Sequence, residues 1–77
     1  MPEEVAKEFA RRVASLGVTV LHHGHDVVIP GEVRYIPDEL SIRGLAHMLA
    51  QKAGVEVVKT VMKDEPGLLF KFLKKVK

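Results

Sequence analysis

Residues 18–37 read Val18-Thr-Val-Leu-His-His-Gly-His-Asp-Val-Val-Ile-Pro-Gly-Glu-Val-Arg-Tyr-Ile-Pro37, and the predicted fold is organised around them. At its centre, Pro30-Gly31 lies between two runs rich in β-branched residues, 26–29 and 32–36. A type II turn favours proline at its second position, where φ is already fixed, and glycine at its third, where φ is positive. The stretch therefore predicts two antiparallel strands joined by a tight turn at Pro30-Gly31.

A third predicted strand, Val18–Leu21, precedes this pair across a histidine-rich turn, His22–Asp26. Because side chains alternate between the two faces of a strand, a tight turn at Pro30-Gly31 places Val28 opposite Val33. The same alternation assigns every expected strand residue to one of two faces. One face carries Val28, Val33 and Tyr35, and the other carries His25, Val27, Ile29, Arg34 and Ile36.

Apolar residues at helical spacing predict a helix on either side of these strands. The first spans residues 2–16, where Pro2 suits the first helical position and Gly17 is a left-handed stop. The second spans residues 42–53, with Ser41 as its N-cap and Gly54 as its stop. The buried stripes would be Val5, Phe9, Val13 and Leu16 in the first helix, and Ile42, Leu45, Ala46, Leu49 and Ala53 in the second.

The final part of the chain fits two structures. Residues 55–63 are rich in valine, which predicts a strand, and Pro66-Gly67 repeats the turn chemistry of Pro30-Gly31, which favours a hairpin. Against the hairpin, Leu69, Phe72, Leu73 and Val76 recur at helical spacing. We expect a strand at 55–63 and a helix at 68–76, with a strand at 68–76 as the alternative.

Together these elements predict one small α+β domain over residues 1–77, because the length leaves no room for a second. The expected architecture is a two-layer sandwich, in which two helices pack on a three-stranded antiparallel sheet in the order α-β-β-β-α. A C-terminal β-hairpin or strand–helix extension completes it. The pairs Gly17/Gly54 and Pro30/Pro66, each offset by roughly 37 residues, also suggest two diverged copies of a helix–strand–turn–strand unit.

Composition narrows the functional classes. The chain is 47% hydrophobic and 29% charged, with a net charge of +2, which is mildly basic. It has no cysteine, which excludes disulfides and thiolate chemistry. Its apolar runs are too short to span a bilayer and its start is acidic, unlike a signal peptide, so we expect a cytoplasmic protein with no membrane partner. The absence of asparagine is typical of thermophilic sources.

His22, His23 and His25 are the densest chemical signal in the sequence. Imidazole binds zinc and nickel, yet His47 and a carboxylate would have to converge on these residues, and their spacing fits no zinc signature. Solvated histidines in a surface turn are one alternative. A general acid–base histidine is another, because the imidazole pKa lies near neutrality. We expect no bound metal and no other cofactor.

The order helix, strand, Gly-His, strand, tight turn, strand, proline, helix and Ala-Gly resembles the HicA-type (YcfA-like) toxin family. The likeness spans about residues 4–54 and implies a double-stranded-RNA-binding-like α-β-β-β-α domain that cleaves RNA with a histidine early in its second strand. On this resemblance His25 takes the catalytic place. The family usually has Gly-Ser-His there, where this chain has Gly24-His25-Asp26. The segments that carry the likeness are Leu16-Gly17-Val18, Gly24-His25, Val33-Arg34-Tyr35-Ile36-Pro37 and Leu49-Ala50-Gln51-Lys52-Ala53-Gly54.

A second resemblance covers only residues 41–63. Ser-Ile-Arg-Gly-Leu-Ala, followed by Gly-Val-Glu-Val-Val-Lys-Thr-Val-Met-Lys, is similar to the small amino-terminal module of bacterial translation initiation factor 2. This likeness rests mainly on helical periodicity, and it leaves the first half of the chain unexplained.

Our first functional prediction is a small domain that binds RNA or another nucleic acid, as a HicA-like toxin with an antitoxin-like protein partner. As a metal-independent endoribonuclease it would use His25 for proton transfer and Arg34 to stabilise the charge of the phosphorane. Basic side chains would bind phosphate, because nucleic-acid affinity is largely electrostatic. The predicted phosphate contacts are Arg43, His47, Lys71, Lys74 and Lys75.

The alternative is a non-catalytic interaction module that forms a homodimer, through an exposed edge strand or its apolar C-terminal segment. The two functions predict different surfaces. Positive charge clustered around His25 would favour the nuclease, whereas dispersed charge beside an apolar surface would favour the interaction module.

Overall fold

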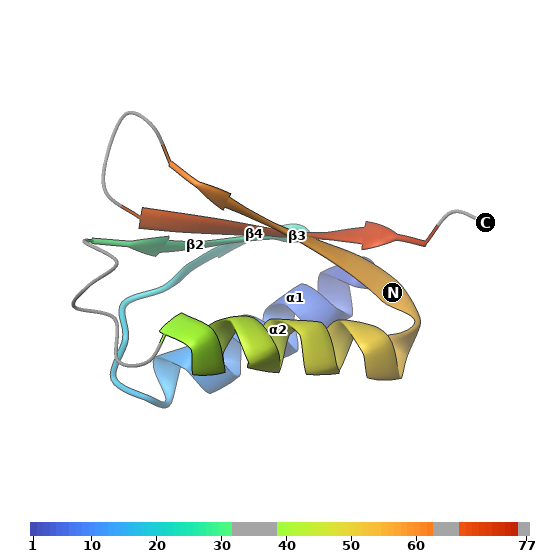
Figure 1. Cartoon of the computed structure of the whole chain (residues 1–77), viewed down its shortest axis with the longest axis horizontal. Coiled ribbons are helices and arrows are strands. Elements are labelled where there is room, and N and C mark those ends of the chain that lie inside the picture. Colours follow the sequence, from blue (N-terminus) through green and yellow to red (C-terminus); the bar gives the residue numbers. More distant parts are fainter. Residues whose placement is uncertain (32–38, 63–66, 76–77) are drawn as a thin grey trace.

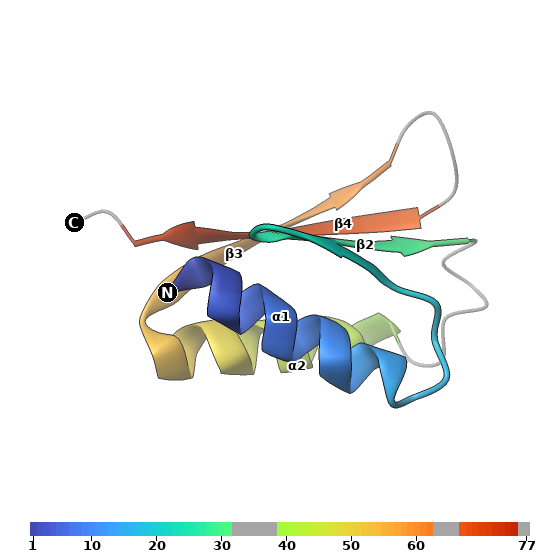
Figure 2. The same ribbon diagram turned by 180° about the vertical axis from the view of Figure 1, so that it is seen from behind.

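The computed structural model describes residues 1–31, 39–62 and 67–75. Its strands form a four-stranded antiparallel sheet in the order β1-β2-β4-β3. Both helices lie on the same side of this sheet (Figure 1), and the reverse view shows α1 beneath the central strands (Figure 2). The described chain is therefore α+β, as predicted. Its elements are α1 (Pro2–Ala14), β1 (Leu21–His23), β2 (Asp26–Pro30), α2 (Glu39–Ala53), β3 (Val55–Val61) and β4 (Gly67–Lys74).

α1 begins at a proline and is followed by a left-handed glycine, as the sequence predicts. Pro2 lies in the first turn, where its missing N–H costs no helical hydrogen bond. Acidic residues fill the first turn and basic residues the last, which complements the helix dipole. Gly17 has a φ of 83°, and its N–H donates to the carbonyl oxygen of Ala14 at 3.0 Å. The predicted helix is confirmed, but it ends at Ala14 instead of residue 16.

α2 begins at Glu39, three residues earlier than predicted, so Ser41 lies inside the helix and is not its N-cap. Its end is correct, because Gly54 has a left-handed φ of 73° directly after Ala53. The helix buries one stripe and exposes another, but the predicted stripe is only partly confirmed, because Leu45 and Leu49 are half-buried and Ala53 is exposed. The buried residues are Ile42, Ala46 and Ala50, and the exposed ones are Arg43, His47 and Gln51.

The prediction of a helix at 68–76 is wrong, because residues 67–74 form the central strand β4. Leu68, Phe70 and Phe72 are fully buried and alternate with partly buried residues, which is the period of a strand. The alternative hairpin is the observed structure, since β4 pairs with β3 along its length. The N–H of Met62 donates to the carbonyl oxygen of Gly67 at 3.1 Å and extends this pairing.

The predicted three-stranded sheet also needs correction. The first strand is Leu21–His23, so His22 and His23 belong to it and only Gly24 and His25 lie between β1 and β2. Val28 pairs with Leu21 on one side and Leu69 on the other. Both sides of Val28 are therefore occupied, and its predicted pairing with residue 33 is wrong. The third predicted strand, 32–36, lies outside the described residues.

The element order repeats, as the glycine and proline offsets suggest. Helix, strand and strand occur twice, and the two hairpins β1–β2 and β3–β4 meet through their second strands, β2 and β4. Gly17 follows the end of α1 by three residues and Gly54 directly follows α2, and both have positive φ. The sheet is thus built from two similar hairpins, each preceded by one helix.

Candidate functional site

The three neighbouring histidines have different surroundings. His22 Nε2 lies 2.7 Å from the carbonyl oxygen of Gly24. His23 is opposite Asp26 in the β1–β2 pairing. His25 Nδ1 lies 3.1 Å from Oδ1 of Asp26, and its side chain is 46% exposed. Because the three histidines have different partners, their closeness in the sequence does not make them a set of metal ligands.

A metal site is also not assembled in the part of the chain that the structure describes. Within residues 1–31, 39–62 and 67–75, no group of three or more histidines and carboxylates is placed to hold a metal ion. The fourth histidine, His47, lies on α2 and lines a groove with residues of β3, which is at the opposite edge of the sheet from β1.

The surroundings of His25 are acidic. A carboxylate oxygen accepts a hydrogen bond from Nδ1–H, so the contact with Asp26 fits an imidazole that carries its proton on Nδ1. Glu3 also lies beside this turn, since a Cβ placed on Gly24 would be 3.8 Å from Glu3 Oε2. The predicted charge stabiliser, Arg34, lies outside the described residues. The described part of the site can orient a histidine, but no lysine or arginine among the described residues forms a hydrogen bond with its imidazole, although Lys71 lies opposite Asp26 on β4.

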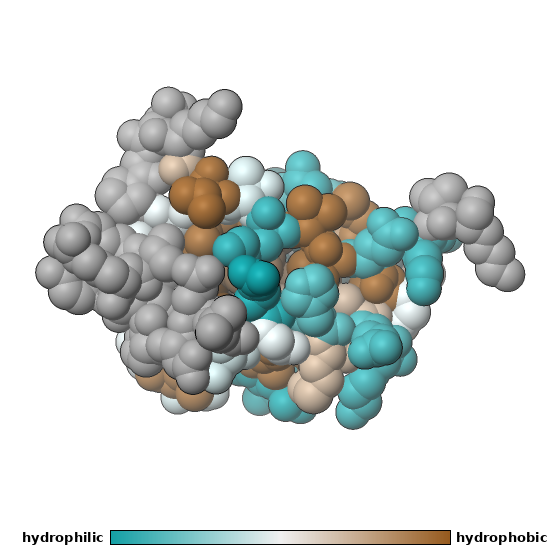
Figure 3. Space-filling model, in the orientation of Figure 1, coloured by the Kyte–Doolittle hydropathy of each residue, from teal (hydrophilic) through white to brown (hydrophobic). Residues whose placement is uncertain are grey.

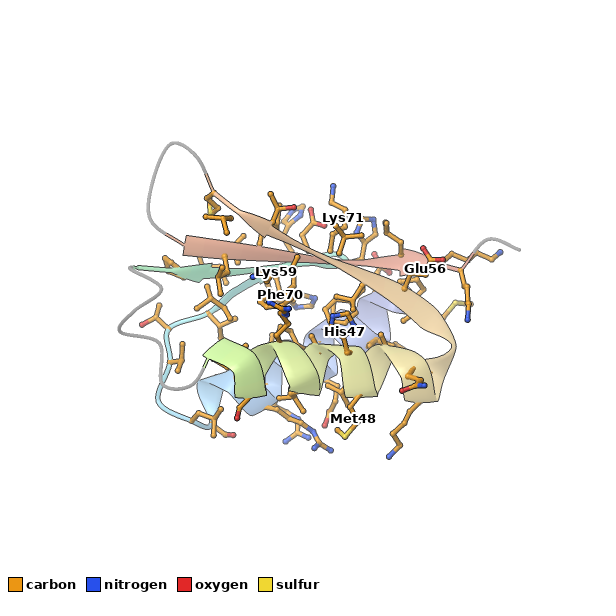
Figure 4. All side chains as sticks on the ribbon, viewed as in Figure 1. His47, Met48, Glu56, Lys59, Phe70 and Lys71 are labelled. Atoms are coloured by element: carbon orange, nitrogen blue, oxygen red, sulfur yellow. The ribbon has the colours of Figure 1, made fainter. Side chains whose placement is uncertain are left out.

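The predicted phosphate contacts lie on different sides of the molecule. His47 points from α2 towards the sheet, whereas Lys71 lies on the far side of the sheet (Figure 4). Arg43 is exposed one turn before His47, and Lys74 ends β4. His47 and Lys75 line the same groove of about 450 Å³ between α2 and β3. This groove is lined by His47, Ala50, Gln51, Val55, Glu56, Val57 and Lys75.

The side of the sheet away from the helices is uncovered in the described part of the chain (Figures 1 and 2). Val27 and Ile29 are buried under the helices, so strand alternation directs Val28 to this opposite side. Residues that pair across neighbouring strands lie on the same side of the sheet, so the pairing register also shows which residues of β1, β4 and β3 lie on this side. The apolar residues of this surface, which we name the open face, are Leu21, Val28, Val58, Leu69 and Leu73.

The open face also has a polar row across its middle. His23, Asp26 and Lys71 are consecutive cross-strand neighbours, and Val58 follows on β3. The Asp26 carboxylate contacts His25, while the Lys71 side chain forms no ion pair or side-chain hydrogen bond within residues 1–31, 39–62 and 67–75. Asp26 and Lys71 therefore place opposite charges side by side on the two central strands. The sequence alone does not indicate this pair, because 26 and 71 meet only through the β2–β4 register.

Charge and apolar surface are mixed over the side of the molecule that carries α2 and β3. Figure 3 shows hydrophilic and hydrophobic residues interspersed there, with no continuous hydrophilic surface.

Comparison of the chain with protein-family models, with curated proteins and with solved structures found no significant match. The resemblance to the HicA-type family stays a prediction on this basis. Among the described residues, no helix is both long enough and apolar enough to cross a membrane.

Proposed function

We propose that this chain is a non-catalytic protein-interaction module that binds its partner through the open face of the sheet. The observation that carries this proposal is the apolar character of that surface. Leu21 is 60% exposed and Val58 is 46% exposed, on the two outer strands. Val28 and Leu69 join them across the centre.

An antiparallel sheet that faces water on one side normally carries polar residues there. Here the row formed by Leu21, Val28 and Leu69 is apolar, and Val58 lies diagonally beside Leu69 on β3. Leu73 lies on the same face of β4, beyond the polar row. A contiguous apolar surface of this kind marks an interaction site in soluble proteins. Its polar members, such as Asp26 and Lys71, would give the contact its orientation.

The same geometry supports nucleic-acid binding less well. The aromatic side chains among the described residues, Phe9, Phe70 and Phe72, are all buried in the core and cannot stack on bases. The cations predicted to bind phosphate lie on opposite sides of the sheet. RNA binding and RNA cleavage stay predictions from the sequence, and the open face favours a protein partner.

The structure also refines how the alternative prediction would work. The apolar C-terminal segment is part of the domain itself, because β4 is a central strand and Phe72 lies in the core. Its other side still contributes Leu69 and Leu73 to the open face. The edge of β3 is a weaker candidate, since Lys59 is opposite Phe70 and so faces the helix side. Inward-pointing charges on edge strands oppose strand addition.

A matched pair of leucines tests the proposal. Leu21 and Leu16 are 60% and 59% exposed, but only Leu21 lies on the open face. We expect Leu21→Glu to reduce binding of an uncharged apolar dye such as Nile red, and Leu16→Glu to leave it nearly unchanged. We also expect no salt-dependent mobility shift with labelled RNA or DNA at two salt concentrations. Equal dye binding by both variants, or a nucleic-acid shift that weakens with salt, would overturn the proposal.

A further inference from the structure

The two charged residues at the centre of the open face indicate what that face binds. We infer that its partner is a second copy of this chain, packed sheet against sheet, an inference that rests on the proposed function. Asp26 and Lys71 are directly opposite each other on β2 and β4, which are the two central strands. Val28 and Leu69 are opposite each other in the next position along the same face. Each strand therefore presents one charge and one apolar residue, in the same order.

This arrangement is complementary to itself under one symmetry operation. A two-fold axis parallel to the strands, midway between β2 and β4, places β2 of one copy over β4 of the other. Asp26 then lies over Lys71 of the second copy, and Val28 lies over Leu69 of the second copy. Each contact occurs twice, as in any isologous interface. The strands of the two sheets remain aligned, which is the usual arrangement when two sheets pack about 10 Å apart.

Other two-fold arrangements of the same surfaces fit less well. An axis perpendicular to the strands and level with Asp26 would place Asp26 against Asp26 of the second copy, with two carboxylates facing each other. Moving that axis to lie between Asp26 and Val28 would place each charge against an apolar side chain, and the charge would lose water without gaining a partner. The strand-parallel axis avoids both costs. On the outer strands it also places His23 over Val58 and Leu21 over Thr60 of the second copy, with no like charges in contact.

The size of the face sets the expected strength of association. Four strands about 4.8 Å apart, with about five residues each rising 3.3 Å, give a contact of roughly 19 Å by 17 Å. This is well below the roughly 800 Å² that each partner buries in a stable interface of standard size. We therefore expect a weak dimer whose population depends on concentration in the micromolar range or above, which sedimentation over a broad concentration range can detect.

Charge reversal provides the decisive test. Asp26→Lys gives each copy two cations at the centre of the face, and Lys71→Asp gives each copy two anions. We expect each single variant to dimerise at least about tenfold more weakly than the wild type, because both pairs across the interface become repulsive. Mixing the two variants should restore association, because each lysine at 26 would then face an aspartate at 71, and each aspartate at 26 a lysine at 71. Repulsion within one chain cannot be relieved by mixing, so rescue reports the contact between copies.

Sedimentation equilibrium of the wild type, the two variants and their mixture gives the result, with circular dichroism to check that each is folded. If a charge variant fails to fold, Leu21→Glu serves instead, and it should weaken the dimer while Leu16→Glu does not. A wild type that stays monomeric at all concentrations would overturn the inference. So would a dimer that survives both charge reversals, since the second copy would then bind elsewhere, for example at the edge of β3. In either case, dye binding that depends on Leu21 would leave the proposed function intact.

Discussion

Phe9 of α1 and Phe70 of β4 meet edge to face, with their ring centroids 4.9 Å apart and an interplanar angle of 62°. The ring of Phe72 lies 5.5 Å from that of Phe9, and all three side chains are fully buried. The first helix is therefore held against a strand from the far end of the sequence. Edge-to-face aromatic pairs add to the stability that their buried area already provides. β4 therefore supplies two of the core side chains against which α1 packs.

Replacement of Phe70 by alanine should destabilise the domain strongly. Phe→Ala in a packed core typically costs about 3–5 kcal/mol, because apolar burial is lost and a cavity remains. Leu69→Ala, at the neighbouring position on the open face, removes a side chain that is only partly buried and should cost less than half as much. Urea unfolding followed by circular dichroism measures both. Similar losses for the two variants would show that the helix side of β4 is not the main core.

Two glycines should respond in opposite directions to the same substitution. Gly31 has a φ of 105°, so Gly31→Ala should destabilise the domain by roughly 1–2 kcal/mol through backbone strain. Gly44 lies inside α2, and an added Cβ there would meet nothing within 4 Å. Gly44→Ala should therefore stabilise the domain by about 0.5–1 kcal/mol through helix propensity. Thermal unfolding of the two variants beside the wild type tests both signs, and a destabilising Gly44→Ala would reveal a contact at that position.

The features that the sequence predicts well are those that depend on neighbouring residues. Val5, Phe9 and Val13 of the predicted α1 stripe, the left-handed stop at Gly17 and the positive φ of Gly31 follow from local rules, and the structure confirms them. The fourth predicted stripe residue, Leu16, lies beyond the helix and is 59% exposed, so that part of the prediction is wrong. β4 shows where local rules fail. Phe72 fits both a helical stripe and a strand alternation, and only the burial of Phe70 between α1 and the sheet decides for the strand.

The candidate site was less predictable for the same reason. Its central pair, Asp26 and Lys71, is joined by the register of two strands that are far apart in the sequence. No periodicity within either strand reports that register. The histidines were the stronger signal in the sequence, but strand alternation separates His23 from its neighbours and leaves His25 beside Asp26.

The ion pairs of Glu8 should make a small part of the domain's free energy of unfolding depend on pH. Hydrogen bonds from Arg12 and then Arg11, both at 2.7 Å, lower the pKa of the Glu8 carboxyl below its ordinary value of 4.5. A carboxyl whose pKa is lower in the folded state stabilises the fold above its unfolded pKa and loses that effect as the pH falls through the folded pKa. Glu8→Gln should therefore lower Tm slightly at pH 7, and the difference from the wild type should close in acid, below pH 4.5.

Salt distinguishes this ion-pair effect from a change in helix propensity. Exposed ion pairs are screened by salt, so 1 M NaCl should reduce the difference in Tm between wild type and Glu8→Gln at pH 7. A difference that is constant across pH and salt would show that the pairs with Arg11 and Arg12 contribute nothing measurable.

The last prediction separates the two functions at His25. Its described neighbours are carboxylates, so we expect purified protein to cleave no RNA at any pH from 5 to 9. His25→Ala should leave Tm nearly unchanged, because the side chain is 46% exposed. A wild type that cleaves RNA, with activity lost in His25→Ala at equal stability and equal RNA affinity, would establish the nuclease and overturn the interaction module. A chelator then separates the mechanisms: activity that persists in the chelator would fit proton transfer by the histidine alone, whereas activity lost in it would require a metal ion.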